Sequence, residues 1–136
     1  MLRLSKRTDY GLLAICDLAG LPRGACRSAR EIAVSYSIPP ALMAKLMQRL
    51  ARRGLVASHH GAKGGYHIAR PAASISLREV IEAIEGPTAM VECLDPCKGE
   101  CPQESTCTVR RPLHQVQARL LEMLGRTTVG DLRREA

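Results

Sequence analysis

Cysteine is the residue type whose number and spacing point most clearly to chemistry in this sequence. The 136 residues include six cysteines, and four fall within fifteen residues: Cys93, Cys97, Cys101 and Cys107. Thiolates are soft ligands that suit iron–sulfur clusters, Zn²⁺ and Cu(I). The pattern Cys-x3-Cys-x3-Cys-x5-Cys lacks the Cys-x2-Cys pairs of a zinc ribbon, although a Cys-x3-Cys step also occurs in zinc sites. The residues alone therefore leave open an iron–sulfur site, a structural zinc site and a thiol switch.

Enzymatic chemistry is the weakest interpretation of this segment. The chain contains no Cys-x-x-Cys motif, and no histidine or acid is recognisably paired with a nucleophile. There is no secretory h-region and no apolar run long enough to span a bilayer. We therefore expect a cytoplasmic protein that is not an enzyme, with no membrane partner and no small-molecule substrate. A disulfide framework is not expected in that reducing compartment.

The distribution of charge predicts a polyanion-binding half. The formal net charge is +7, and residues 1–71 contain twelve Lys or Arg against three acids, whereas residues 72–136 contain eight against ten. A basic lobe joined to a mildly acidic one is typical of a nucleic-acid-binding module that has a second functional region. A merely solvated basic surface remains possible on charge alone.

The elements that would position these groups follow from periodicity and capping. We expect helices over residues 5–21, from Ser28, from Pro40 to about Arg53, and from Ser76 to Gly86. Ser28 and Ser76 each begin a capping box with an acid three residues later. Residues 55–58 and 66–69, on either side of a Gly-rich tip, are predicted to form a hairpin.

Helix, helix, basic helix and hairpin in this order predict a mainly α winged helix-turn-helix fold with a two-stranded wing. In such folds the third helix enters the major groove and the wing reaches the neighbouring minor groove or backbone. The alternative is a winged helix that binds protein, which the charge asymmetry disfavours. The predicted contacts to double-stranded DNA are Ser28, Pro40, Ala41, Ala44, Lys45, Gln48, Arg49, Arg52, His60 and Lys63.

A last helix is expected after Pro112, and it has an apolar seam. The seam follows a 3-4-3 spacing typical of coiled coils, and consists of Leu113, Val116, Leu120 and Met123. The sequence thus divides into a winged-helix domain (1–86), a cysteine loop (87–111) without usable periodicity, and a dimerisation helix with a C-terminal tail (112–136). We expect a homodimer.

Several motifs together resemble the bacterial iron–sulfur winged-helix regulators that include IscR and NsrR. They are Leu-Arg-Leu-Ser-Lys-Arg-Thr-Asp-Tyr at 2–10, the Gly-Gly-Tyr wing at 64–66, Val-Ile-Glu-Ala-Ile-Glu-Gly at 80–86, and the cysteine loop. Cys-Pro-Gln-Glu-Ser-x-Cys-x-Val-Arg at 101–110 looks most like the branch that regulates the SUF cluster-assembly operon.

The resemblance implies a [2Fe-2S] or [4Fe-4S] cluster held by three cysteines per subunit. Cys93, Cys101 and Cys107 match those three, and Cys97 is extra. Arg110 stands where IscR has a histidine, and Asp9 aligns with the aspartate that completes the NsrR cluster from the partner subunit. Asp9 is therefore the leading fourth ligand, with Cys97 as its rival and His114 as a weaker candidate. His60 replaces the wing arginine of IscR.

The function implied is a repressor of iron–sulfur cluster assembly genes that is controlled by its own cluster. The alternatives are a zinc-stabilised or thiol-redox winged-helix transcription factor and a nitric-oxide-sensing repressor of another regulon.

Overall fold

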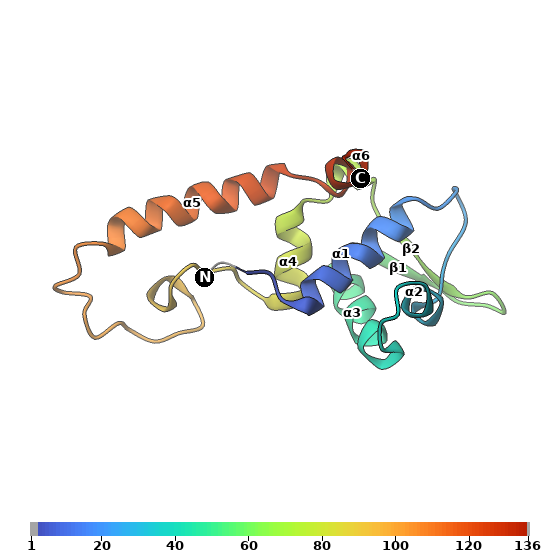
Figure 1. Cartoon of the computed structure of the whole chain (residues 1–136), viewed down its shortest axis with the longest axis horizontal. Helices are drawn as coiled ribbons and strands as arrows, with labels where there is room; N and C mark the ends of the chain where they lie inside the picture. The colour runs from blue at the N-terminus through green and yellow to red at the C-terminus, as the bar shows by residue number, and fades with distance from the viewer. Residues whose placement is uncertain (1–2, 136) are drawn as a thin grey trace.

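The computed structural model describes residues 3–135, and it has the architecture of a winged helix with a long helical extension (Figure 1). The sheet contains β1 and β2 only, and two short 3-10 turns occur at Ala72–Ser74 and Glu92–Leu94. The predicted fold class, mainly α with a two-stranded wing, is confirmed. The elements are α1 (Lys6–Ala19), α2 (Ala29–Ser35), α3 (Pro40–Arg52), β1 (Val56–His59), β2 (Gly65–Ile68), α4 (Leu77–Glu85), α5 (Arg110–Arg126) and α6 (Val129–Arg134).

Local capping explains where several helices begin. The Ser28 hydroxyl accepts from the Glu31 amide at 3.0 Å, which places the start of α2 as predicted. At α4 both halves of the capping box are present, because the Glu79 carboxylate also accepts from the Ser76 amide at 2.8 Å. Arg70 donates to the same carboxylate, and this bond lowers the pKa of Glu79.

The core is aliphatic, because the chain contains neither Phe nor Trp. Apolar faces of α1, α2, α3 and α4 form one core, in which α3 contacts the other three helices and strand β1. The fully buried side chains with the largest volumes are Ile15, Leu18, Ile32, Met43, Leu46, Met47, Leu50, Leu55, Ile75, Val80, Val129 and Thr8. This packing fixes α3 with one face inward and the other toward solvent.

The wing forms one residue away from the predicted strand bounds. Strands β1 and β2 pair antiparallel in the register Val56 with Ile68 and His59 with Gly65. A bridge between Arg27 and Tyr66 ties β2 to the segment before α2, with the Arg27 amide 3.0 Å from the Tyr66 carbonyl. The wing is therefore a fixed part of the winged-helix domain.

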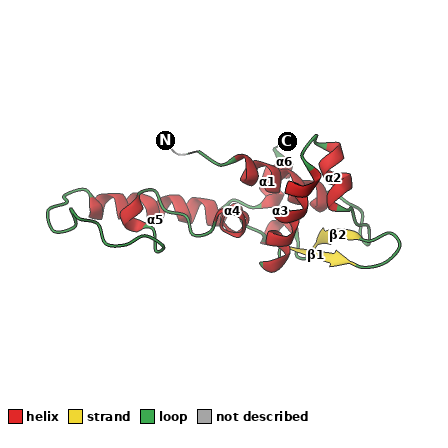
Figure 2. Ribbon diagram, turned by 90° about the horizontal axis from the view of Figure 1, so that it is seen from below, coloured by secondary structure: helices red, strands yellow, loops and turns green. Residues whose placement is uncertain are grey.

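Helix α5 projects away from the other helices in both views (Figure 1 and Figure 2). It begins at Arg110, so the expectation of a start after Pro112 was wrong by three residues. Pro112 fits the first turn, where a missing amide hydrogen leaves no bond unmade. The cysteine loop runs from the end of α4 to the far end of α5 (Figure 1).

The chain then returns to the winged-helix domain through α6, which the periodicity did not predict. Val129 is fully buried in the core, and its amide donates to the Ile75 carbonyl at 2.9 Å. The Leu77 amide donates to the Thr127 carbonyl at 2.7 Å. Residues 127–129 are thus part of the packed domain, although they follow α5 in sequence.

Within the part of the chain that the structure describes, no helix has the length and apolar character needed to cross a bilayer.

Candidate nucleic-acid interface and thiol site

The outward face of α3 gathers most of the residues predicted to contact DNA. Burial of Met43, Leu46, Met47 and Leu50 turns the opposite side of the helix to solvent. On that side Pro40, Ala41, Lys45, Gln48 and Arg52 are exposed, and Ala44 is half-buried. This exposed face therefore presents guanidinium, ammonium and amide donors of the kind that reach base edges and phosphates.

Arg49 differs from its neighbours on α3. Its side chain lies between the buried and the exposed faces, and Nη1 donates to the Ile84 carbonyl at 2.8 Å. Arg52, one turn away in the C-terminal direction, is exposed. Both arginines are predicted from the sequence to contact DNA, but their surroundings in the structure differ.

The wing and the start of α2 supply the remaining predicted contacts. His60 and Lys63 are exposed near the tip of the wing. The Ser28 hydroxyl already serves as the N-cap of α2. The Cys26 thiol, which the sequence did not single out, donates to the Lys63 carbonyl at 3.2 Å. Only a tertiary contact could have drawn attention to Cys26.

Replacing Gly65 by alanine is expected to destabilise the wing. A Cβ at Gly65 would lie 2.6 Å from the carbonyl carbon of Arg27 and 2.8 Å from the Ser28 amide nitrogen. Backbone atoms cannot move aside as a flexible side chain can, so either the Arg27–Tyr66 bridge opens or the strand shifts. We expect a loss of about 1–3 kcal/mol in the free energy of unfolding, measured by chemical denaturation.

Gly99→Ala is the matched control, because a Cβ at Gly99 meets no atom of the described chain within 4 Å. Its free energy of unfolding should equal that of the wild type within about 0.5 kcal/mol. Equal stability of Gly65→Ala and Gly99→Ala would contradict the close approach of the wing to residues 27–28.

The four clustered thiols lie in a partly exposed segment. Cys93, Cys101 and Cys107 are half-buried, Cys97 is exposed, and all four are free. Among residues 3–135 of one chain, no three Cys, His, Asp or Glu side chains stand close enough to hold a metal ion. A cofactor bound here would have to draw the loop around itself.

The candidate fourth ligands occupy separate places. Cys107 and His114 line one hollow of about 460 Å³ at the start of α5, together with Arg110 and Arg111. Asp9, in the first turn of α1, lines a different cavity with Tyr10, Leu13, Cys16, Leu132 and Arg133. Within one chain, therefore, His114 adjoins one of the clustered cysteines and Asp9 does not.

Cys16 belongs to the packed domain rather than to the thiol cluster. It contacts the core from α1, and burial raises the pKa of its thiol. A thiol of raised pKa is a poor nucleophile and a poor ligand at neutral pH. This agrees with the role of a small apolar residue that its position in the helix indicates.

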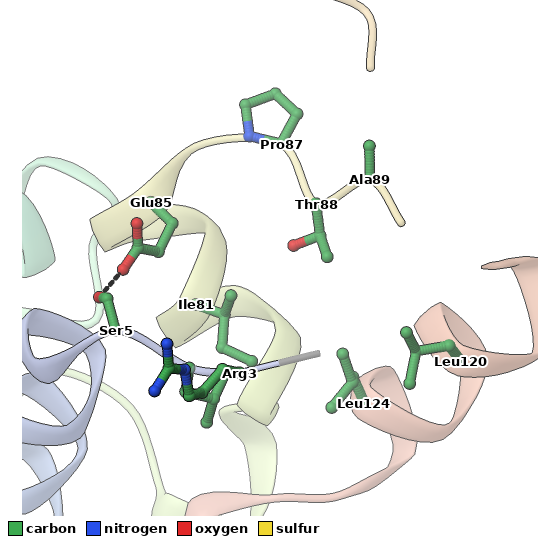
Figure 3. A pocket seen from close by; sticks show the side chains of 10 residues that line it. Arg3, Ser5, Ile81, Glu85, Pro87, Thr88, Ala89, Leu120 and Leu124 are labelled. Atoms are coloured by element: carbon green, nitrogen blue, oxygen red, sulfur yellow. Dashed lines mark hydrogen bonds between the residues drawn. The ribbon is translucent and has the colours of Figure 1, made fainter. Parts of the chain in front are cut away.

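A third cavity, of about 470 Å³, lies where the N-terminal segment, α4 and α5 meet (Figure 3). Ile81, Leu120 and Leu124 supply apolar walls. Among the described residues, Thr88 alone has a buried side-chain oxygen without a hydrogen-bond partner. At one side Glu85 accepts from Ser5, as the dashed line in Figure 3 shows, and from Thr8 at 2.8 Å.

Comparison with known proteins identifies the family that has this combination of wing, basic helix and cysteine loop. A family model named Rrf2, described as an iron-dependent transcriptional regulator, matches residues 4–135. This chain belongs to the Rrf2 family. The Rrf2 family and the winged-helix fold are those of DNA-binding transcriptional regulators, not of enzymes.

Individual Rrf2-like relatives cover nearly the whole chain. An HTH-type transcriptional regulator of Mycobacterium tuberculosis is 30% identical over 132 residues, which are 96% of this chain and 81% of the relative. The structure of CymR, the global cysteine regulator of B. subtilis, has a TM-score of 0.79 at 28% identity and covers 100% of this chain and 99% of CymR.

Two further Rrf2-like structures bear on the thiols. T. potens IscR has a TM-score of 0.75 at 25% identity, over 98% of this chain and 88% of IscR. The oxidised form of Staphylococcus aureus CymR has a TM-score of 0.73 at 26% identity, over 97% of this chain and 96% of CymR. This Rrf2 chain is thus similar both to IscR and to CymR.

Proposed function

We propose that this Rrf2 chain is a homodimeric repressor of iron–sulfur cluster assembly genes, of the SUF-operon type, and that a cluster in its cysteine loop controls operator binding. The observation that carries the proposal is the gathering of four free thiols in one loop that joins α4 to α5. A loop in this position is connected directly to the winged-helix domain at one end and to the extended helix at the other.

The chemistry of the donor set fits an iron–sulfur cluster. Thiolate sulfur is the usual ligand of such clusters, and a partly exposed loop can fold around one. When bound, the cluster would supply iron and sulfide that react readily with oxygen or nitric oxide. Cys93, Cys101 and Cys107 are the proposed thiolate ligands, and Cys97 at the exposed centre of the loop is the extra thiol.

Asp9 of the partner subunit remains the leading candidate for the fourth ligand. Its place on α1, apart from the thiols of its own chain, is consistent with a contribution across a dimer. A carboxylate is a harder and weaker partner for iron than a thiolate, so such a site would be labile. His114, beside Cys107, and Cys97 are the alternatives from within the chain.

The proposed dimer is supported by exposed apolar residues along α5. Val109, Val116 and Met123 are 55%, 46% and 56% exposed, and they follow one another at seven-residue spacing. Leu113 and Leu120 stand between them at coiled-coil positions. The helix has no fully buried residue in a single chain. A second copy of α5 would cover this apolar face.

The proposed mode of operator binding follows from α3 and the wing. In the dimer, one α3 from each subunit would enter a major groove with Lys45, Gln48 and Arg52 directed at the DNA. His60 and Lys63 on the wing would lie near the flanking backbone or minor groove.

Protein purified without oxygen tests the cluster directly. We expect a brown protein with iron and acid-labile sulfide, and we expect Cys101→Ala to lose both the colour and at least nine-tenths of the iron, because a three-thiolate site cannot lose one ligand and keep its affinity. Absorbance, iron and zinc content are the measurements. Asp9→Ala should shift the spectrum or shorten its lifetime in air, whereas Cys97→Ala should leave both unchanged.

Cys16→Ala is the matched control, since its thiol lies in the packed domain, and it should remain brown. Colourless protein with one zinc per chain would replace the proposal with a zinc-stabilised regulator. Bleaching by Cys97→Ala together with an unchanged Asp9→Ala would remove Asp9 from the ligand set.

A thiol-redox regulator is the second candidate, and Cys26 favours it. The Cys26 thiol bonds to the wing at Lys63, so its oxidation would displace a DNA-contacting element. The similarity to CymR, which has been solved in an oxidised form, points the same way. In that case anaerobic protein would be colourless and zinc-free, and Cys26→Ala would abolish the sensitivity of DNA binding to peroxide.

A further inference from the structure

The C-terminal end of α4 is joined to α3, the recognition helix of the proposed DNA complex, by a hydrogen bond with a charged donor. The last carbonyls of a helix have no partner within that helix. For Ile84 the partner comes from α3, because Nη1 of Arg49 donates to its carbonyl at 2.8 Å. Residues 82–85 include no Lys or Arg. Arg49 therefore also places a positive charge at the negative end of the α4 dipole.

The same end of α4 is held to α1. The Ile84 side chain packs so closely on Gly11 that a Cβ at Gly11 would overlap its Cδ1 atom. The neighbouring Glu85 carboxylate accepts from Ser5 (Figure 3) and from Thr8, which is fully buried. Ile84 thus contacts both α1 and α3, and Glu85, the next residue, is bonded to the start of α1.

The cysteine loop starts immediately beyond this point. Gly86 has a φ of +84°, a value that favours glycine, and it turns the chain out of α4 into Pro87. From there no helix or strand intervenes before the 3-10 turn that contains Cys93. One bond holds the intervening segment to α5, from the Met90 amide to the Gln117 side-chain oxygen at 2.8 Å. A displacement of the loop therefore bears on α5 through Met90 and on the Ile84–Glu85 pair through Gly86.

We propose that Arg49 is a positioning residue, which fixes the angle of the recognition helix against the end of α4 and so connects the cysteine loop to the DNA-reading surface. The positioning role stands on the contacts alone. The connection to the loop rests on the proposed function. A switch requires two conformations of the protein that differ in at least one contact. The Arg49–Ile84 bond is a contact that a movement of the cysteine loop could make or break.

A direct phosphate contact is the competing role for Arg49, and the dependence of binding on salt separates the two. Each phosphate neutralised by a side chain adds about 0.9 to the slope of log affinity against log salt. A residue that acts through the orientation of α3 changes affinity without changing that slope. Arg52, exposed on the same helix, is the matched comparison.

The test compares Arg49→Met and Arg52→Met, since methionine keeps an aliphatic stem and removes the charge. The probe is a duplex selected from a random-sequence library by the wild-type protein. Binding is measured over a salt series for protein as purified without oxygen and for protein treated with a chelator. We expect Arg49→Met to lose roughly tenfold in affinity at an unchanged slope, because its bond has a charged donor. Arg52→Met should lower the slope by about one unit per subunit.

The ratio of the affinities of the two protein states tests the connection to the loop. We expect this ratio to fall toward one in Arg49→Met and to stay at the wild-type value in Arg52→Met. A reduced slope in Arg49→Met would make Arg49 a phosphate contact and overturn the positioning role. An unchanged ratio would overturn the connection. If Arg49→Met does not fold, Arg49→Gln gives the same two measurements.

Failure of the proposed function would look different. If wild-type protein contains neither a cluster nor zinc, the ratio is one for every variant, and the salt slopes still decide whether Arg49 positions α3 or contacts phosphate.

Discussion

Alanine at Leu113, Val116 and Leu120 together is expected to yield monomers whose operator affinity is lower by roughly a hundredfold or more. Linking two DNA-reading heads makes the second binding event intramolecular, and this gain in affinity is of the order of 10²–10⁴. The substitutions remove Val116, which is 46% exposed in a single chain, and the half-buried Leu113 and Leu120 beside it in the proposed seam. Light scattering measures the oligomeric state, and gel-shift titration on a selected duplex measures the affinity.

Gln115→Ala with Glu122→Ala is the matched control for the seam. Both residues are exposed on α5, and the helical period places them away from Val116 and Leu120. This double variant should remain a dimer and bind as the wild type does. Wild-type protein that is monomeric at micromolar concentration would refute the dimer altogether.

Aspartate at Val129 is expected to cost about 3–5 kcal/mol in the free energy of unfolding. Val129 has no exposed surface, so the substitution buries a carboxylate without a counter-charge and removes an apolar contact. The hydrogen bonds from the Val129 amide to Ile75 and from the Leu77 amide to Thr127 also require residues 127–129 to pack in this position. Chemical denaturation followed by circular dichroism gives the change.

Val34→Asp provides the comparison, because Val34 is 69% exposed on α2. It introduces the same side chain, and its effect should stay within about 0.5 kcal/mol. A cost for Val129→Asp as small as that for Val34→Asp would mean that α6 does not complete the core.

The elements predicted correctly from the sequence are those set by local chemistry. Ser28 and Ser76 place the starts of α2 and α4, since a capping hydroxyl needs only an amide two or three residues away. The wing follows from two short strands around glycines, and the buried face of α3 follows from the spacing of its apolar residues. In each case the deciding interaction lies within a few positions of the residue.

What the sequence did not predict depends on contacts between distant segments. Helix α6 has only six residues, too few for a period, and its buried Val129 is recognised only from the return of the chain. Arg49 and Arg52 look alike in sequence, but only Arg49 lies opposite Ile84. The ligand set is a harder case, because a fourth ligand from a second subunit, as proposed for Asp9, would leave no spacing pattern in one chain.

The burial of Val129 also sets an order of events during synthesis. The winged-helix domain lacks one of its core residues until position 129 has left the ribosome, and by then the cysteine loop and α5 have already emerged. Domains form as their chains emerge from the N-terminus, so a core that needs a late residue is completed late. The thiols of the cysteine loop therefore leave the ribosome before the core of the winged-helix domain is complete.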